Sequence, residues 1–348
     1  MRTLNIAMLG FGNAGQAFAK LLMEKHREIR TREGFDIHIT AIVTGSRGSL
    51  VNNEGIDLEK ACSDITILGK LDSNDPAYSQ LSSFEIVDQA DYDMLIELTP
   101  LAIFSGQPAI RHIKGAFARG KHVITANKGP IAWAYRELKE MAASSGSLFF
   151  YETTVMDGTP IFNLVEDTLK YCKVLEVSGI LNSTTNFILE ELAGGKPYDQ
   201  VINEGMRRGF IEADPAMDIE GWDAAAKITA LLNVLMDANI TPRDIDRAGI
   251  ENISLSDIEE AAIRGNVIKL LCRGAIENGK VSGSVKPVEI SRSDLLAGIS
   301  GTSSIVSITT DLMGKISIIE HDPEIEQTGY GIFSDLIRML ENMKTKNK

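Results

Sequence analysis

Short apolar runs alternate with longer one-sided apolar stretches along the first 150 residues. The apolar runs are typical of buried parallel strands: Leu4–Leu9, Ile37–Val43, Met94–Leu98, Lys121–Thr125 and Ser147–Tyr151. The stretches between them predict helices at Gln16–Arg30, Gln107–Arg119 and Trp133–Ser144, with a short helix in 52–69. This order predicts a doubly wound, Rossmann-type α/β domain over residues 1–150.

The pattern changes over residues 151–310. Strand-like runs occur at Val174–Leu181, Val267–Ile276, Lys280–Val288 and Thr302–Thr309, and Asn278-Gly279 predicts a hairpin turn. Helices are expected at Ile161–Leu169, at Phe187–Leu192, and from an N-cap at Asp218 through Met236. We expect a second α/β domain, a sheet backed by helices. Residues 311–348 then form a C-terminal segment whose helix, Asp335–Met343, packs back on the first domain.

Composition narrows the class of function. The 348 residues are 44% hydrophobic and 24% charged, as in an ordinary globular protein, and the net charge is −13. This charge argues against nucleic acid or an anionic membrane as partner. The cysteines, Cys62, Cys172 and Cys272, show neither metal spacing nor a disulfide pattern. The absence of a disulfide pattern makes a reducing cytoplasm the expected location. The N-terminal apolar run is too short to span a membrane and continues into a glycine motif, so we do not interpret it as a signal peptide.

A dinucleotide fingerprint follows the first strand. Gly10-Phe11-Gly12-Asn13-Ala14-Gly15 stands between this strand and a helix, the context that the G-x-G-x-x-G motif requires. Its glycines let the backbone approach a pyrophosphate at the helix N-terminus; the alternative is a glycine turn without a ligand. The second strand ends in Thr44-Gly45-Ser46-Arg47-Gly48, without the acid that NAD requires. Arg47 suits a 2′-phosphate, so NADP is favoured over NAD, unless Arg47 is simply solvated.

Polar residues also follow later strands. Thr99 and Lys128 come at carboxyl ends of strands, where open α/β sheets bind ligands, so Lys128 is either a surface residue or a cation beside the nicotinamide. The loop Glu152–Pro160 is a hinge between domains or a site for a hard cation, and its chemistry alone favours the hinge. The turn Asn182–Asn186 carries enough polar groups to hold a small polar substrate, beyond simple helix capping.

The segment Gly209–Lys227 concentrates charge beside apolar residues. Asp223 and Lys227 are four residues apart and share one helical face. Burial and mutual repulsion of such charges favour a functional site, whereas the simpler alternative is a capped helix with one ion pair. The spacing alone leaves these two alternatives open.

Taken together, these segments resemble the homoserine dehydrogenases. The resemblance covers nearly the whole chain and rests on six motifs: GFGNAG at Gly10–Gly15, TANKGP at Thr125–Pro130, the loop Glu152–Pro160, GILNSTTNFIL at Gly179–Leu189, GFIEADPAMDIEGWDAAAK at Gly209–Lys227, and SDL at Ser334–Leu336. It implies reversible reduction of L-aspartate 4-semialdehyde to L-homoserine by NADPH, or alternatively by NADH, in the branch to threonine, methionine and isoleucine. It also implies a homodimer formed through the second domain.

The resemblance assigns roles to individual residues. Lys227 would donate a proton to the aldehyde oxygen, and Asp223 would orient Lys227 or a water molecule. Lys128 would lie near the nicotinamide and the reacting oxygen. Substrate would bind Glu212, Asp218 and Thr184; cofactor would bind residues 10–15, Arg47, Thr99 and Lys128. The family has a sodium site in a loop like Glu152–Pro160, so the resemblance favours a cation site there over a hinge. The candidate cation ligands are Glu152, Val155, Asp157 and Thr159.

The chain departs from the family pattern in places. It ends before a C-terminal regulatory domain, so we expect a short form without feedback through such a domain. Ser183 stands where glycine is commoner. The segment Glu320–Glu326 is acidic where the family has a glycine-rich cofactor contact. A dehydrogenase of another small amino acid or aldehyde, and a catalytically silent NADP-binding sensor, are the alternatives. Asp214 and Glu220 receive no role.

Overall fold

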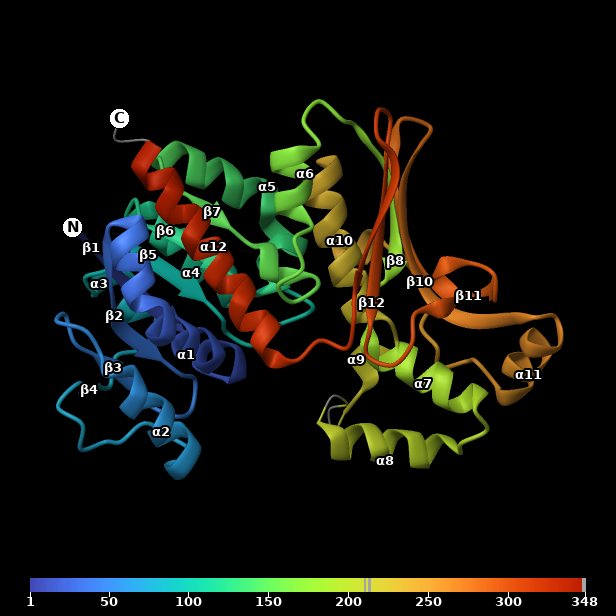
Figure 1. The fold of residues 1–348 in the computed structure, drawn as a ribbon, viewed down its shortest axis with the longest axis horizontal. Coiled ribbons are helices and arrows are strands. Elements are labelled where there is room, and N and C mark those ends of the chain that lie inside the picture. Colours follow the sequence, from blue (N-terminus) through green and yellow to red (C-terminus); the bar gives the residue numbers. More distant parts are fainter. Residues whose placement is uncertain (210, 212–213, 346–348) are drawn as a thin grey trace. The chain divides into compact units, whose positions relative to one another are not determined.

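The structure is a computed structural model that describes residues 1–209, 211 and 214–345. The chain forms two compact units, Met1–Pro160 with Glu324–Lys348, and Ile161–Pro323. In Figure 1 the ribbon colours follow the sequence, from blue at the N-terminus to red at the C-terminus.

The first unit is a seven-stranded sheet covered by helices on both faces. The strand order is β4-β3-β2-β1-β5-β6-β7. The five strands β2, β1, β5, β6 and β7 are parallel to one another, and β3 and β4 add an antiparallel edge next to β2. Its strands are β1 (Arg2–Leu9), β2 (Phe35–Val43), β3 (Ser49–Val51), β4 (Tyr78–Ser79), β5 (Met94–Glu97), β6 (His122–Thr125) and β7 (Phe149–Phe150). Its helices are α1 (Asn13–Glu28), α2 (Leu58–Leu68), α3 (Ser83–Gln89), α4 (Ala109–Ala118), α5 (Lys128–Ser145) and α12 (Ile325–Thr345), with short turns η1 (Ile29–Glu33) and η2 (Glu152–Thr154).

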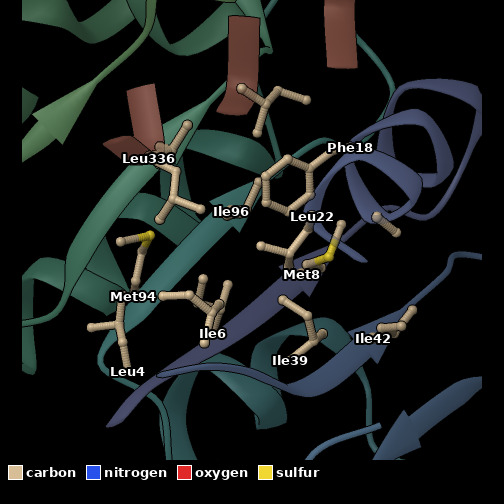
Figure 2. Packing of buried hydrophobic residues seen from close by; sticks show 14 of the residues in the cluster. Leu4, Ile6, Met8, Phe18, Leu22, Ile39, Ile42, Met94, Ile96 and Leu336 are labelled. Carbon is tan, nitrogen blue, oxygen red and sulfur yellow. The ribbon is translucent and has the colours of Figure 1, made fainter. Parts of the chain in front are cut away.

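The central strand β1 shows why both faces are covered. Leu4, Ile6 and Met8 enter the core under α1, α2 and α12, whereas Ala7 and Leu9 enter the core under α3, α4 and α5. Successive side chains of a strand point to opposite faces, so the apolar run Ile6–Leu9 requires cover on both. Figure 2 shows the first of these cores, with Phe18 and Leu22 of α1 and Leu336 of α12 over the sheet.

The second unit is a six-stranded sheet of order β13-β12-β8-β10-β11-β9. All its pairs are antiparallel except β11 with β9. Helices α7, α10 and α11 pack against it. Its strands are β8 (Val174–Ile180), β9 (Asp246–Arg247), β10 (Asn266–Glu277), β11 (Lys280–Ser291), β12 (Ser304–Thr310) and β13 (Gly314–Glu320). Its helices are α6 (Phe162–Thr168), α7 (Ser183–Ala193), α8 (Tyr198–Arg208), α9 (Ala216–Ile219), α10 (Trp222–Met236) and α11 (Leu255–Ile263), with turns η3 (Pro242–Asp244) and η4 (Leu295–Gly298).

The fold class agrees with the sequence prediction, but the unit boundaries differ from the predicted 150 and 310. The loop after β7 belongs to the first unit because α12 holds it: Glu152 N–H donates to Asp335 at 2.9 Å, and Thr328 donates to Asp157 at 2.6 Å. Strand β13 belongs to the second unit because it pairs with β12 along its whole length. The chain re-enters the first unit with α12, which packs against α1.

Two helix starts also differ from the prediction. Asp218 is not an N-cap; it lies inside the short helix α9, and the long helix α10 begins after Gly221. Helix α12 begins at Ile325, ten residues before the predicted Asp335. Gly331, in the second turn of this helix, lies against the loop of Gly158, where an added Cβ at Gly158 would stand 2.4 Å from the Gln327 carbonyl oxygen. Glycine here therefore serves close packing within the unit.

Candidate functional site

The glycine turn after β1 forms a cradle at the centre of the first sheet. Strand β1 pairs with both β2 and β5, so its carboxyl end is the point where the strand order reverses. Gly10 has φ +100°, and an added Cβ would lie 2.3 Å from the Leu98 carbonyl oxygen, so only glycine fits. A Cβ at Gly12 would meet nothing within 4 Å. The backbone there is thus open to a ligand at the N-terminus of α1, which has no side-chain cap.

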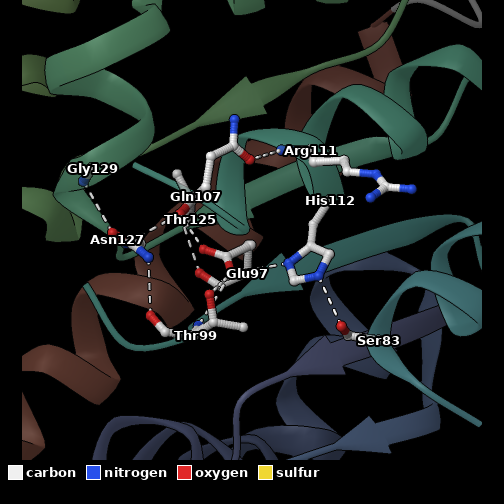
Figure 3. A network of polar contacts seen from close by, with 9 residues as sticks. All are labelled: Ser83, Glu97, Thr99, Gln107, Arg111, His112, Thr125, Asn127 and Gly129. Carbon is white, nitrogen blue, oxygen red and sulfur yellow. Dashed lines mark hydrogen bonds and ion pairs between the residues drawn. The ribbon is translucent and has the colours of Figure 1, made fainter. Parts of the chain in front are cut away.

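A buried polar network fixes the neighbouring strand ends (Figure 3). The Glu97 carboxylate, fully buried, accepts hydrogen bonds from the Thr99 backbone N–H and hydroxyl, and Thr125 Oγ1 lies 3.4 Å from it. His112 Nδ1 lies 3.6 Å from Glu97, and His112 Nε2 lies 2.8 Å from Ser83 Oγ. A buried carboxylate costs free energy unless it is hydrogen-bonded, so these donors hold β5 and β6 together at the cofactor edge.

The same network positions Lys128. Asn127 donates to the Thr99 carbonyl at 2.9 Å and accepts from the Gly129 N–H at 3.0 Å, which caps α5. Lys128 is the first residue of α5 and is half-buried. The structure thus brings the predicted residues Thr99 and Lys128 to the carboxyl ends of β5 and β6, as their sequence positions suggested.

Arg47 lies in the turn after β2. Thr44 closes this turn: its hydroxyl donates to the Gly48 carbonyl at 2.7 Å and accepts from the Arg47 N–H at 2.8 Å. The Arg47 side chain is exposed and makes no hydrogen bond or ion pair in the described part of the chain. It is therefore available for an anionic ligand at the end of β2.

The loop proposed for a cation is buried and rich in oxygen. Glu152, Val155 and Thr159 are at most 9% exposed, and Asp157 has φ +43°. The main-chain oxygens of Val155 and Thr159 accept no hydrogen bond from any described residue. Nowhere in the described part of the chain, however, do three or more His, Cys, Asp or Glu side chains form a group that could hold a metal ion. The donor set thus suits a hard cation bound mainly by carbonyl oxygens. The chain also leaves the first unit directly after this loop, at Pro160.

A cluster of two acids and a lysine forms in the second unit. Lys227 Nζ lies 3.4 Å from Asp223 Oδ2, one turn earlier on α10, and donates to the Leu181 carbonyl oxygen at 2.7 Å. Asp218 comes from α9. The side chains of Lys227 and Asp223 are 18% and 15% exposed, so water screens this pair only in part.

Asn182 joins the two acids and is the site residue that the sequence did not single out. Its Nδ2 donates to Asp218 Oδ1 at 2.6 Å and to Asp223 Oδ2 at 3.0 Å. Its Oδ1 accepts from the Thr185 N–H at 2.8 Å and so caps α7. The sequence signal was the polar turn Asn182–Asn186, but the partners lie 36 and 41 residues away.

A buried thiol lies beside this cluster. Cys272 on β10 is fully buried, 4.0 Å from the Ala224 carbonyl oxygen. Burial raises the pKa of the Cys272 thiol to about 12, although the Lys227 ammonium opposes the shift. The thiol is therefore neutral and does not compete with Asp223 for the lysine.

The remaining predicted residues have separate positions. Thr184 is buried in the first turn of α7, next to Asn182. Glu212 lies outside the described residues. Asp214 accepts from the Ala216 N–H at 3.1 Å, a turn before α9, and Glu220 accepts from the Trp222 indole at 3.2 Å. These contacts give Asp214 and Glu220 local structural roles.

A glycine cradle at the switch point of a Rossmann-type sheet, with a second α/β unit that carries a lysine and acids, defines an NAD(P)-dependent oxidoreductase. Two family models match the chain: "Homoserine dehydrogenase, NAD binding domain" over residues 10–152, and "Homoserine dehydrogenase" over residues 160–337. The chain belongs to the homoserine dehydrogenase family.

Individual relatives agree with this assignment. The NAD(+)-dependent homoserine dehydrogenase of Pseudomonas canavaninivorans is 32% identical, with 100% of this chain and 99% of the relative covered. The homoserine dehydrogenase of Methanocaldococcus jannaschii is 34% identical over 98% of this chain and 100% of its own. A hyperthermophilic archaeal homoserine dehydrogenase, solved in complex with NADPH, is similar with a TM-score of 0.83 and 28% identity, covering 98% of both chains.

Proposed function

We propose that the chain catalyses the reversible NAD(P)-dependent reduction of L-aspartate 4-semialdehyde to L-homoserine. The observation that carries the proposal is the cluster of Lys227, Asp223, Asp218 and Asn182, built from three separate helices beside the polar turn. Family membership and the glycine cradle support the same reaction.

In this proposal Lys227 is the general acid. A bound nicotinamide would supply the hydride, and the aldehyde oxygen would gain negative charge as the hydride arrives. Lys227 would stabilise that charge and donate a proton. Asp223 at 3.4 Å orients the ammonium, and the Leu181 carbonyl oxygen accepts a hydrogen bond from it at 2.7 Å. Lys128 in the first unit would stabilise the same oxygen or the substrate carboxylate.

The substrate is a zwitterion, so its ammonium needs an anion. Glu212 and Asp218 are the acids proposed for this task, with Thr184 as a further hydrogen-bonding group. Asn182 neutralises part of the repulsion between Asp218 and Asp223, because one amide bridges both carboxylates. In this proposal Asp218 binds the substrate and Asp223 orients the lysine.

NADP is the proposed preferred cofactor. The turn after β2 presents the exposed Arg47 and no acid, which suits a 2′-phosphate. The relatives point both ways, since one is named for NAD(+) and another was solved with NADPH. Residues 10–15 would hold the pyrophosphate, and Thr99 would lie near the nicotinamide.

Three further assignments are part of the proposal. Sodium would bind Glu152, Val155, Asp157 and Thr159, supported by the carbonyl oxygens that accept no hydrogen bond; exchange of sodium for choline in the assay would then lower thermal stability. A homodimer is expected from the family and is tested by light scattering. The cytoplasm is expected from three cysteines that are all free thiols. Within the described residues every helix is too short or too polar to cross a membrane.

The deciding experiment is a spectrophotometric assay of L-homoserine oxidation with NADP and with NAD. Turnover with L-homoserine well above that with other small amino acids and aldehydes supports the proposal. Folded protein without turnover with either cofactor would contradict it and leave the cofactor-binding sensor.

Lys227→Ala separates the two outcomes further. It should lower kcat by roughly 10²–10⁴-fold, the usual contribution of a general acid, while NADPH affinity is unchanged. Asp214→Asn is the matched control for Asp223→Asn, since the hydrogen bond that Asp214 makes with a described residue closes a turn. If Asp214→Asn costs as much activity as Asp223→Asn, the assignment of roles is wrong.

A further inference from the structure

Lys269 is a buried lysine that the proposed reaction does not use. It lies on β10, is only 5% exposed, and donates to Asn186 Oδ1 at 2.7 Å and to the Ile299 carbonyl oxygen at 2.6 Å. Both acceptors are neutral. No described carboxylate lies within ion-pair distance of it.

A buried charge without a counter-charge is costly, so most buried lysines are paired. Burial lowers the pKa of Lys269 below the ordinary value of a lysine, and the nearby Glu190 carboxylate opposes this shift. Two neutral acceptors satisfy two of the three ammonium donors. An anion beside Lys269 would satisfy the third and supply the missing charge.

There is room for such an anion. A cavity of about 290 Å³ is lined by Lys269 together with Glu190, Arg292 and the apolar side chains of Leu189, Ile258 and Val267. This volume is near the lower end for small-molecule sites, which are roughly 300–1,000 Å³. The cavity therefore suits a ligand of a few heavy atoms.

The charged groups around the cavity have complementary signs. The exposed Arg292 guanidinium makes no hydrogen bond or ion pair with any described residue, so the cavity offers two cations. The Glu190 carboxylate is held by the Gly301 N–H at 2.6 Å and provides one anion. Two cations, one acid and an apolar wall match a carboxylate, an ammonium and a short apolar side chain.

We propose that this cavity binds a small α-amino acid, with its carboxylate between Lys269 and Arg292, its ammonium at Glu190 and its side chain against Leu189 and Ile258. The cavity is lined by the C-terminal half of α7, at Leu189, Glu190 and Ala193, whereas the cluster of Lys227 and the two acids contacts Asn182, the N-cap of that helix. The proposal does not rest on the reaction proposed above.

Isothermal titration of the whole chain with L-alanine, L-valine, L-isoleucine and L-threonine tests it. At least one of them should bind with a dissociation constant in the micromolar to millimolar range. Arg292→Ala should weaken that binding roughly tenfold to a hundredfold, since hydrogen bonds to charged groups are being lost, and should leave turnover unchanged. Lys286→Ala, another exposed cation on the same sheet, is the matched control and should bind as the wild type does.

Analogues of valine test the two ends separately. Isovalerate lacks the ammonium and isobutylamine lacks the carboxylate, so each should bind at least about tenfold more weakly than L-valine if L-valine binds. Glu190→Gln should remove the advantage of L-valine over isovalerate. Binding to the Lys269→Met variant is interpreted only if circular dichroism shows that the variant is folded. If the variant is not folded, binding to Arg292→Ala decides the question. Absence of binding by all four amino acids overturns the proposal, as does binding that Arg292→Ala and Glu190→Gln leave intact.

Discussion

Replacement of Asn182 by Asp tests the geometry of the cluster that we propose to be catalytic. Aspartate caps helices about as well as asparagine, so the cap on α7 and the bond from the Thr185 N–H survive. The change replaces the Nδ2 donor by a carboxylate oxygen, placed where the donor now meets Asp218 at 2.6 Å and Asp223 at 3.0 Å. Two attractive contacts thus become two repulsive ones.

The expected size of the effect follows from these contacts. Each hydrogen bond to a charged group contributes about 1.5–3 kcal/mol. Two like charges about 4 Å apart repel by about 4 kcal/mol at an effective dielectric constant of about 20, and partial exposure of the cluster lowers that figure. The repulsion separates the acids or favours protonation of one of them. Because separation or protonation relieves most of the repulsion, the expected net loss in transition-state stabilisation is about 3–4 kcal/mol, which lowers kcat/KM by roughly two to three orders of magnitude.

The assay is homoserine oxidation across a pH series for wild type, Asn182→Asp and Asn182→Ser. Serine also caps a helix but adds no charge, so it loses only the two donor contacts. Activity should fall in the order wild type, serine variant, aspartate variant. The activity of the aspartate variant divided by that of the serine variant should rise as the pH falls, because protonation of the new carboxylate removes the added charge. A ratio that does not change with pH, or an aspartate variant as active as wild type, would refute this reasoning.

Further predictions concern the cofactor, the packing of α12 and the buried thiol. Arg47→Ala should raise the KM for NADP roughly tenfold to a hundredfold and leave that for NAD unchanged, since only NADP carries the 2′-phosphate; equal effects on both would contradict the assignment. Gly158→Ala should cost about 1–3 kcal/mol of unfolding free energy, measured with urea, because its Cβ would meet the Gln327 carbonyl at 2.4 Å; Gly45→Ala, with nothing within 4 Å, should stay within about 0.5 kcal/mol. Burial raises the pKa of the Cys272 thiol from its ordinary value of 9.0 to about 12 in the folded chain. Its contribution to stability is therefore complete below pH 9 and is lost as the pH rises toward 12, so Cys272→Ala should flatten the pH dependence of unfolding in that window.

The first unit was predictable because its signals are local. The run Leu4–Leu9 is apolar at every core position. The glycines that follow it predict a tight turn, and Gly10 has the positive φ that such a turn requires. The strand ends that carry Thr99 and Lys128 followed from the same alternation. Short edge strands such as β3 and β4 escaped prediction, since three and two residues carry too little periodicity.

The second unit and its site were less predictable because their contacts are distant in sequence. Asp223 and Lys227 are one turn apart, so their pairing was visible in the spacing. The bridge from Asn182 to Asp218 and Asp223 depends on how α7, α9 and α10 meet. No pattern along the chain encodes that meeting. Helices α8 and α11 were missed, although α11 has a complete capping box at Ser254 and Asp257.

The connectivity of the first unit has a consequence for synthesis. Its sheet and the helices α1 to α5 are complete by residue 150, yet the core beneath α1 also requires Ile332, Leu336, Met339 and Leu340 of α12. More than a hundred intervening residues, from Ile161 to Pro323, must leave the ribosome before these side chains exist. The nascent nucleotide-binding sheet thus waits with one apolar face covered by α1 and α2 but not yet by α12, a state prone to aggregation. Chaperone binding to this face, followed by release when α12 docks, is the expected sequence of events during translation.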